Sequence, residues 1–257
     1  AGCGGGNEEP AATDGTDTAE RTTFTVGFDA EYPPYGYKND AGEYVGFDLD
    51  LAQEVCDRNG WELVKQPLDW SSKDMELNSG TVDCLWNGFT MTGRESEYTF
   101  SKPYVDNSIV FVVRQDSDIQ TKEDLAGKIV ITQAGSSALA ALTNTEDNDE
   151  NLALAATFAS LEQTPDYNSA FMSLETGAVD AIAVDIGVAQ YQIDKREEGA
   201  YVMLAGDDNK LASEQYAVGF KKGNEELRDT VQDTLDEMVK DGTFAEIAEK
   251  WLSLIHI

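Results

Sequence analysis

The side chains that most often act in catalysis are scarce in this chain. It has a single histidine, His256, which is the last residue but one, and three cysteines, Cys3, Cys56 and Cys84, which form neither a Cys-x-x-Cys pair nor a spacing typical of metal ligands. Nucleophilic catalysis by a Ser-His or Cys-His pair therefore lacks its base, and a histidine-based zinc site lacks its ligands. We expect no catalytic residue, no metal and no cofactor.

Charged side chains follow two apolar stretches of the chain. Asp185 ends the run Ala181–Val184, and Arg94 comes shortly after the run Val82–Phe89, which we expect to be a buried strand. In open α/β sheets, ligands bind beyond the carboxyl ends of the strands. We therefore expect residues Asn87–Thr92 and Asp185 to face a common cleft.

Each of these two charges also has a simpler interpretation. Asp185 could cap the helix that follows it, which is a common role for aspartate. Arg94 could lie on a helix surface and pair with Glu95 or Glu97. The residues alone leave both interpretations open.

Strand-like and helix-like stretches alternate in the part of the chain that would position these residues. Asp48 is expected to cap the first helix. The order predicts mostly parallel sheets covered by helices. The expected elements are a strand at Phe24–Phe28, a helix at Asp48–Asn59, a strand containing Leu63 and Val64, a helix around Asp74–Asn78, a stop at Gly80, and the strand Val82–Phe89.

One pattern occurs twice. Leu77–Cys84 and Leu174–Ala181 both read Leu-x-x-Gly-x-Val-Asp followed by a small residue, which is typical of a helix end, a glycine stop and entry into a buried strand. The repetition predicts two lobes that are built alike.

The chain would cross between these lobes twice, near Lys102–Asn107 and near Gly206–Ser213, which makes a two-segment hinge. The first lobe would comprise residues 24–104 and 212–251, and the second lobe residues 108–206. We expect the ligand cleft to lie between them.

The charge of the chain is strongly negative, with 18 Lys and Arg against 49 Asp and Glu. A nucleic-acid-binding protein needs a basic surface, so this class is excluded. Most of the acids should form a solvated surface that keeps the protein soluble and monomeric.

The two ends differ from the rest. Ala1-Gly2-Cys3 resembles the end of a bacterial lipoprotein signal, in which the cysteine is lipidated, and residues 1–23 read as this remnant followed by a flexible tether. Residues 252–257, Leu-Ser-Leu-Ile-His-Ile, read like a translated sequencing adapter, so we suspect a non-native tail.

Five motifs in order identify a family. The chain resembles the bacterial extracellular solute-binding proteins of the polar amino-acid uptake family, which are the ligand-capturing subunits of ABC importers. The resemblance implies a type II periplasmic binding protein fold with two hinged lobes. It rests on Asp29–Tyr35, Gly46–Cys56, Phe100–Tyr104, Asp124–Lys128 and Gly135–Ala138.

The resemblance implies a site for a free amino acid, whose two charges each need a partner. Arg94 would bind the carboxylate with two parallel bonds, and Asp185 would bind the ammonium. Ser137 and the backbone N–H groups of Ser136 and Ser137 would add donors at a helix start, where Ser137 could equally be a plain cap. The remaining shell would come from the Gly88 carbonyl, Thr90 and Thr92.

The ligand side chain would lie between Tyr32 and Trp70, while Trp86 belongs to the core. Asp29 would suit a distal ammonium or guanidinium, and Asn87 an amide or hydroxyl. Together these residues favour a polar or cationic amino acid.

The family resemblance implies ABC permease subunits as partners. It also implies a location at the extracellular face of the membrane or in the periplasm, with a lipid anchor through Cys3. Two alternatives stay open: a cyclohexadienyl or arogenate dehydratase-like enzyme, for which Glu31 would be the proton donor, and a ligand-presenting sensor subunit. Cys56 and Cys84 could form a disulfide outside the cell, but two buried thiols are favoured.

Overall fold

The computed structural model describes residues 20–252. Cys3, most of the expected 1–23 tether and all but the first residue of the suspected 252–257 tail lie outside the described residues.

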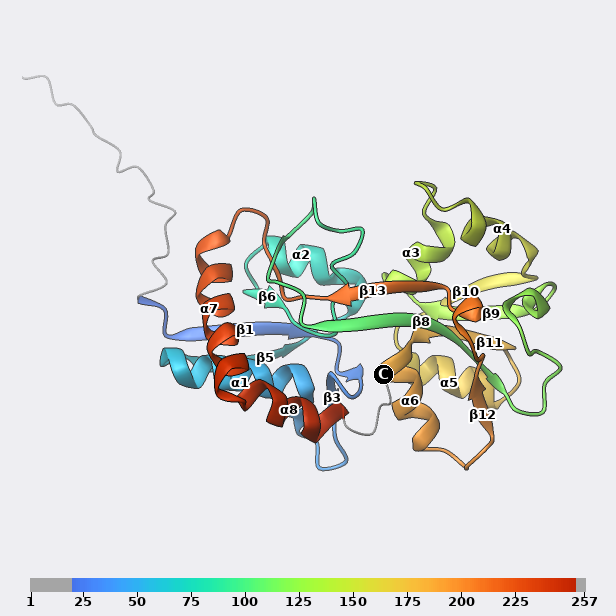
Figure 1. Cartoon of the computed structure of the whole chain (residues 1–257), viewed down its shortest axis with the longest axis horizontal. Helices are drawn as coiled ribbons and strands as arrows, with labels where there is room; N and C mark the ends of the chain where they lie inside the picture. Colours follow the sequence, from blue (N-terminus) through green and yellow to red (C-terminus); the bar gives the residue numbers. More distant parts are fainter. Residues whose placement is uncertain (1–19, 253–257) are drawn as a thin grey trace, which may run out of the picture.

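The described chain forms two α/β lobes that lie side by side, as predicted (Figure 1). The first lobe has a five-stranded sheet in the order β5-β1-β6-β14-β7 and a small sheet in the order β2-β3-β4. Its strands are β1 (Thr23–Phe28), β2 (Glu31–Tyr32), β3 (Gly36–Lys38), β4 (Tyr44–Val45), β5 (Glu62–Pro67), β6 (Cys84–Leu85), β7 (Thr99–Phe100) and β14 (Gly219–Phe220). Its helices are α1 (Phe47–Asn59), the short η2 (Trp70–Ser72), α2 (Lys73–Asn78), α7 (Glu225–Asp241) and α8 (Thr243–Leu252).

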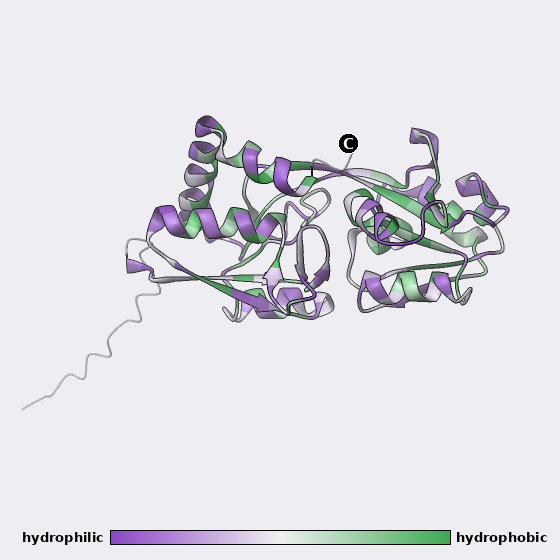
Figure 2. Cartoon of the chain, turned by 90° about the horizontal axis from the view of Figure 1, so that it is seen from below, coloured by the Kyte–Doolittle hydropathy of each residue, from purple (hydrophilic) through white to green (hydrophobic). Residues whose placement is uncertain are grey.

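The second lobe has a six-stranded sheet in the order β10-β9-β11-β8-β12, with β13 also paired to β8. Hydrophobic residues gather on its strands, and hydrophilic ones on the outer helices (Figure 2). Its strands are β8 (Val105–Arg114), β9 (Ile129–Gln133), β10 (Ser160–Thr164), β11 (Ala181–Asp185), β12 (Tyr201–Met203) and β13 (Ala212–Tyr216). Its helices are η3 (Lys122–Leu125), α3 (Ser137–Thr143), α4 (Asp149–Thr157), α5 (Tyr167–Glu175), α6 (Ile186–Asp194) and η4 (Asp207–Asn209).

Both sheets are mixed. In each, the strands linked by helices pair in parallel, β1 with β5 and β6, and β9 with β10 and β11. The strands that carry the chain across or back run the other way, so β14 is antiparallel to β6, and β8 is antiparallel to β11, β12 and β13. The expected parallel pairing therefore holds for the βαβ part of each lobe only.

Two local expectations were wrong. Asp48 does not cap α1, because the N-cap is Gly46 and Asp48 lies buried in the first turn, where it accepts hydrogen bonds from the Gly88 N–H at 2.5 Å and the Tyr104 hydroxyl at 2.6 Å. The expected strand Val82–Phe89 is a strand only at Cys84–Leu85. Gly88, with a φ of 56°, turns the chain away from the sheet, and Asp48 holds that turn.

Cys56 and Cys84 are both buried free thiols, as favoured. Burial raises the pKa of Cys56 to about 12 and that of Cys84 well above its ordinary value. Neither thiol is therefore a reactive thiolate at neutral pH.

The repeated pattern has the same structure in both lobes. Gly80 and Gly177 adopt left-handed φ angles of 81° and 77° after α2 and α5. The aspartate that follows accepts a hydrogen bond from a backbone N–H of a parallel strand, β1 or β9: Asp83 from Thr25 at 2.7 Å, and Asp180 from Ile129 at 2.8 Å. The pattern thus fixes the loop that follows a helix to an interior strand of each sheet in the same way.

Replacing either aspartate, by Asp83→Ala or Asp180→Ala, should lower the free energy of unfolding by about 1–3 kcal/mol, because a partly buried N–H loses a charged acceptor. Urea unfolding measures the change. The control is Asp118→Ala, whose carboxylate pairs with Lys128 but is 82% exposed, and which should change stability by less than about 0.5 kcal/mol. Aspartate variants no less stable than this control would contradict the prediction.

Candidate functional site

A cavity lies between the two lobes at the strand ends that the sequence singled out. The volume of this cavity that is open to water is about 10 Å³, which is room for about one water molecule. Of the residues expected at the site, all but Asp29 and Thr92 line it. The lining comprises Tyr32, Trp70, Asn87, Gly88, Thr90, Arg94, Gln133, Ser136, Ser137 and Asp185.

Arg94 is a half-buried cation without an ion-pair partner among residues 20–252. Its guanidinium donates to the Thr90 carbonyl at 3.1 Å and the Gly135 carbonyl at 3.4 Å, and lies 5.0 Å from the ring centre of Phe89. Burial lowers the pKa of Arg94, although neighbouring carboxylates, Glu214 first, act in the opposite direction. Arg94 lies in a turn outside the helices, so the helix-surface interpretation does not hold.

Asp185 is a buried anion that has only neutral hydrogen-bond donors around it. Its side chain accepts from the Asn107 amide at 2.9 Å and from the Tyr216 hydroxyl. It occupies the N-cap position of α6, yet it makes no capping hydrogen bond. Burial and the nearby charge of Glu214 raise the pKa of Asp185 to about 7.

The two serines lie at the start of α3 and differ in role. The Ser136 hydroxyl accepts from the Leu139 N–H at 3.1 Å and therefore caps the helix. The Ser137 hydroxyl instead points across the cleft and donates to Glu214 at 2.8 Å.

Two aromatic rings form walls of the cavity and are nearly fully buried, Tyr32 with 5% and Trp70 with 6% of its surface exposed. Trp70 packs edge-on against Phe89, with 5.5 Å between ring centres. The Tyr32 and Tyr216 hydroxyls lie 3.4 Å apart. Trp86 is fully buried, as expected of a core residue.

The polar residues expected to contact the far end of the ligand side chain do not all line the cavity. Asn87 lines the cavity, and its buried Oδ1 has no hydrogen-bond partner within the described part of the chain. Asp29 lies beside the cavity, where it accepts from the Gln133 amide at 2.6 Å and the Glu31 N–H at 2.9 Å. Burial raises the pKa of Asp29 to about 7. Thr92 is exposed and accepts from the Gln215 N–H at 3.1 Å, so it faces β13 rather than the cavity.

The structure adds residues that the sequence did not indicate. Glu214 and Tyr216 come from β13, Asn107 from β8, and Gln133 from the end of β9. Thr90 donates to Glu214 at 2.5 Å, and Asn107 donates to the same oxygen at 2.9 Å. The two crossing segments, which form β8 and β13, were expected to act only as a hinge. The alternation of polar and apolar residues in them does not indicate that one face of each strand lies at the site.

The lobes make direct contacts around the cavity. The Lys73 ammonium of the first lobe donates to the Gly135 carbonyl of the second at 3.2 Å, and Gln133 reaches back to Asp29. Gly187 in α6 faces the Tyr35 ring so closely that an added Cβ would overlap the hydroxyl and lie 3.1 Å from Cζ. The lobes are therefore closed on each other.

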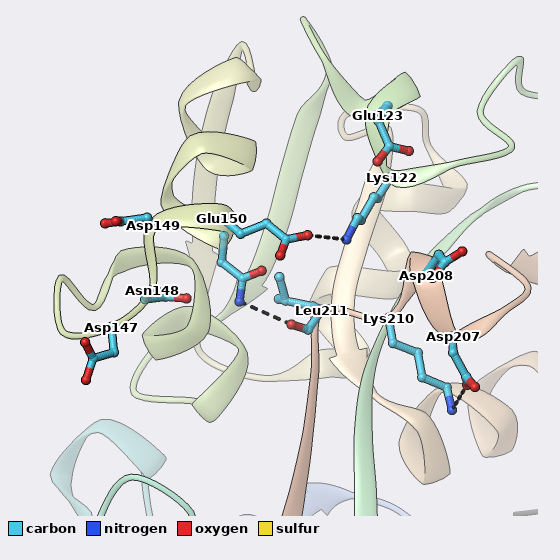
Figure 3. A pocket seen from close by; sticks show the side chains of 11 residues that line it. Lys122, Glu123, Asp147, Asn148, Asp149, Glu150, Asp207, Asp208, Lys210 and Leu211 are labelled. Carbon is cyan, nitrogen blue, oxygen red and sulfur yellow. Dashed lines mark hydrogen bonds and ion pairs between the residues drawn. The ribbon is translucent and has the colours of Figure 1, made fainter.

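A second, larger hollow of about 710 Å³ lies among η3, α4 and η4 of the second lobe (Figure 3). Its walls carry many acids, but Glu150 pairs with Lys122 at 3.2 Å and Asp207 with Lys210 at 2.9 Å. The side chains of Asp147 and Asp149 point away from these pairs (Figure 3). The acids do not converge on one point, so this hollow is no counterpart of the cavity between the lobes.

Neither a metal-binding cluster nor a membrane span is found in the described part of the chain. No three histidine, cysteine or acidic side chains among residues 20–252 are placed to share a metal ion. No helix there combines the length and hydrophobicity needed to cross a bilayer.

Sequences of amino-acid-binding proteins align with most of this chain. The L-cystine-binding protein TcyJ of Escherichia coli K12 is 30% identical over 235 residues, which are 90% of this chain and 83% of that protein. The L-cystine-binding protein TcyA of Bacillus subtilis is 30% identical over 260 residues, covering 98% and 91%. The histidine-binding periplasmic protein of Escherichia coli K12 is 29% identical over 233 residues, covering 88% and 86%.

Solved structures give the same result. A substrate-binding protein of an ABC uptake transporter from Streptococcus pneumoniae with bound histidine superposes with a TM-score of 0.83 at 33% identity, covering 90% of this chain and 92% of that one. An ancestral arginine-binding protein bound to arginine superposes with a TM-score of 0.79 at 32% identity, covering 90% and 98%. The sequence pattern of the bacterial extracellular solute-binding proteins, family 3, matches residues 24–254. With two hinged lobes and charged groups facing a cavity between them, the chain belongs to that family.

Proposed function

We propose that the chain is the substrate-binding component of an amino-acid ABC importer and that it binds a free polar or cationic α-amino acid between its lobes. The observation that carries this proposal is the pair of opposite charges, Arg94 and Asp185. Both line one cavity, and each is held by neutral groups rather than by a counter-ion.

Such a pair complements a zwitterion. Removing a carboxylate and an ammonium from water costs several kcal/mol for each charge unless the site supplies a partner. Arg94 uses two of its N–H groups on carbonyls, and its remaining donors suit a carboxylate. Asp185 suits the ammonium, since it is already dehydrated and lacks a cation.

The distal groups favour a side chain that is polar or cationic. The Asn87 oxygen has no hydrogen-bond donor among residues 20–252, and Asp29 holds a buried carboxylate beside Gln133 of the cavity wall. Tyr32 and Trp70 offer aromatic faces to methylene groups or to a cation. The relatives that bind cystine, histidine or arginine are consistent with this choice.

We propose that the two lobes open and close about the two crossing strands, β8 and β13. The cavity as it stands admits no amino acid, so the lobes must part for entry. We place the lobes at residues 24–104 with 212–251 and at residues 108–206, and the hinge in β8 and β13. The ligand would then hold the closed arrangement by contacting both lobes.

We further infer delivery to ABC permease subunits by a monomer tethered through a lipid on Cys3 at the extracellular face of the membrane or in the periplasm. The net charge of −31 supports the monomeric state. An enzymatic role is not proposed: Glu31, the acid that a dehydratase would need, does not line the cavity, and its carboxylate accepts a hydrogen bond from Asn168.

Arg94→Ala should weaken amino-acid binding at least about a hundredfold, since the ligand carboxylate would be buried without a cation. Calorimetry with L-cystine, L-histidine and L-arginine measures the change. Arg228→Ala is the matched control, because Arg228 lies on α7, pairs with Asp229 and does not line the cavity. Equal affinity of Arg94→Ala and wild type would contradict the role of Arg94.

Binding should weaken as the pH falls below about 7, by up to about tenfold per pH unit, because protonated Asp185 cannot pair with an ammonium. Calorimetry near pH 7 in buffers of different ionisation enthalpy should detect proton release. In the ligand-free protein, the raised pKa of Asp185 makes the folded state less stable as the pH rises, whereas ligand binding becomes tighter. The unfolded chain loses this proton near pH 4, so the free protein becomes less stable between about pH 4 and 7. A pH-independent affinity would count against Asp185.

Gly187→Ala should weaken binding by preventing full closure, because its Cβ overlaps the Tyr35 hydroxyl. Tyr35→Phe removes that hydroxyl, so the double variant should recover part of the affinity, while Tyr35→Phe alone is the matched control. Small-angle scattering at saturating ligand should report a more extended Gly187→Ala protein. Wild-type affinity and compactness in Gly187→Ala would show that this contact does not govern closure.

A further inference from the structure

The Glu214 carboxylate lies beside the cavity, bonded to two of the residues that line it, Thr90 and Ser137, and is nearly buried, with 9% of the residue exposed. It comes from the return strand β13, and a single oxygen, Oε1, accepts three hydrogen bonds. The donors are the Thr90 hydroxyl of the first lobe at 2.5 Å, the Ser137 hydroxyl of the second lobe at 2.8 Å, and the Asn107 amide of β8 at 2.9 Å.

The charge of Glu214 acts on both members of the opposite-charge pair without an ion pair to either. Among the carboxylates near Arg94 it is the one that most stabilises the guanidinium, and it opposes ionisation of Asp185. All three hydrogen bonds of Glu214 come from neutral groups, and no cation among residues 20–252 forms an ion pair with its carboxylate.

Two of those donors are the groups that an amino-acid carboxylate at Arg94 would use. A hydroxyl carries one hydrogen, so Thr90 and Ser137 cannot donate to Glu214 and to a ligand carboxylate at the same time. The two carboxylates would also repel each other beside one guanidinium. Only the Asn107 bond of Glu214 is independent of the ligand.

We propose that Glu214 is an internal competitor of the ligand carboxylate, which must take the Thr90 and Ser137 hydrogens from it before the amino acid is fully bound. This inference rests on the proposed function, in which the ligand carboxylate lies at Arg94. Glu214 lowers the affinity for amino acids and selects against ligands that carry additional negative charge near this end of the cleft.

The test compares Glu214→Gln with wild type by calorimetry. The probes are L-arginine, L-histidine and L-cystine, together with the carboxamides of the same amino acids. The variant should bind the free amino acids about three- to tenfold more tightly, since one repulsion is removed. It should bind the carboxamides, which lack the negative charge, no more tightly than wild type does. The quantity compared is the ratio of the two affinities, because partial misfolding lowers both alike.

Asp106→Asn is the matched control. Asp106 lies on β8 beside the same strand, is exposed and accepts from Gln215, so the variant removes one negative charge near the hinge without touching the cleft. Its affinity ratio should change less than twofold. Glu214→Ala, which also removes the charge, should shift the ratio in the same direction as Glu214→Gln.

The outcomes separate the two proposals. If wild type binds none of the probes, the proposed function fails and this inference fails with it. If wild type binds amino acids and Glu214→Gln binds them equally or more weakly, Glu214 holds the lobes together or contacts the ligand favourably, and the inference alone is overturned. An equal gain for amino acids and carboxamides overturns it as well.

Discussion

The two lobes are joined by the antiparallel pairing of β8 and β13, in register from Ala212 opposite Ile109 to Tyr216 opposite Val105. Because successive side chains of a strand point to opposite faces, Glu214 and Tyr216 lie on one face of β13 and are buried, while Ser213 and Gln215 are exposed. The register also places Glu214 directly opposite Asn107. A one-residue shift would turn this whole face outward. The pairing of β8 and β13 is thus also what assembles the polar cluster around Glu214 beside the cavity.

Around that centre the protein keeps charges apart from their counter-ions. Asp185, Glu214 and Asp29 receive amide, hydroxyl or backbone donors, and Arg94 contacts carbonyls. Neutral donors satisfy hydrogen-bonding capacity but compensate burial of charge only in part, which is why the pKa of Asp185 and that of Asp29 rise to about 7. Direct ion pairs inside the cleft would stabilise the protein and leave little for a ligand to gain. On the proposed function, the arrangement leaves these charges available to the ligand.

The sequence was sufficient to predict features that depend on neighbouring residues in the chain. A glycine stop after a helix and an apolar run ending in a charge located the strand ends, and these placed Arg94 and Asp185 at one cavity. It was insufficient where a residue's environment comes from elsewhere in the chain. Asp48 satisfies the capping rule, yet it bonds to Gly88 and Tyr104 because tertiary contacts bury it. Glu214 stands among polar residues of an ordinary strand, and only its register with β8 makes it a buried carboxylate.

The two lobes share a construction but contribute unequally to the site. Each uses the same aspartate-to-backbone bond to fix the loop before its inner strand, through Asp83 and Asp180. Beyond that point the first lobe turns at Gly88, under the control of Asp48, and brings Arg94 to the cleft, whereas the second continues its strand to Asp185 and passes directly into α6. Similar frames thus bring opposite charges to one cavity, Arg94 from a turn beyond β6 and Asp185 from the end of β11. On the proposed function, a zwitterion would join the lobes in one orientation only, since turning it end for end would set each of its charges against a like charge.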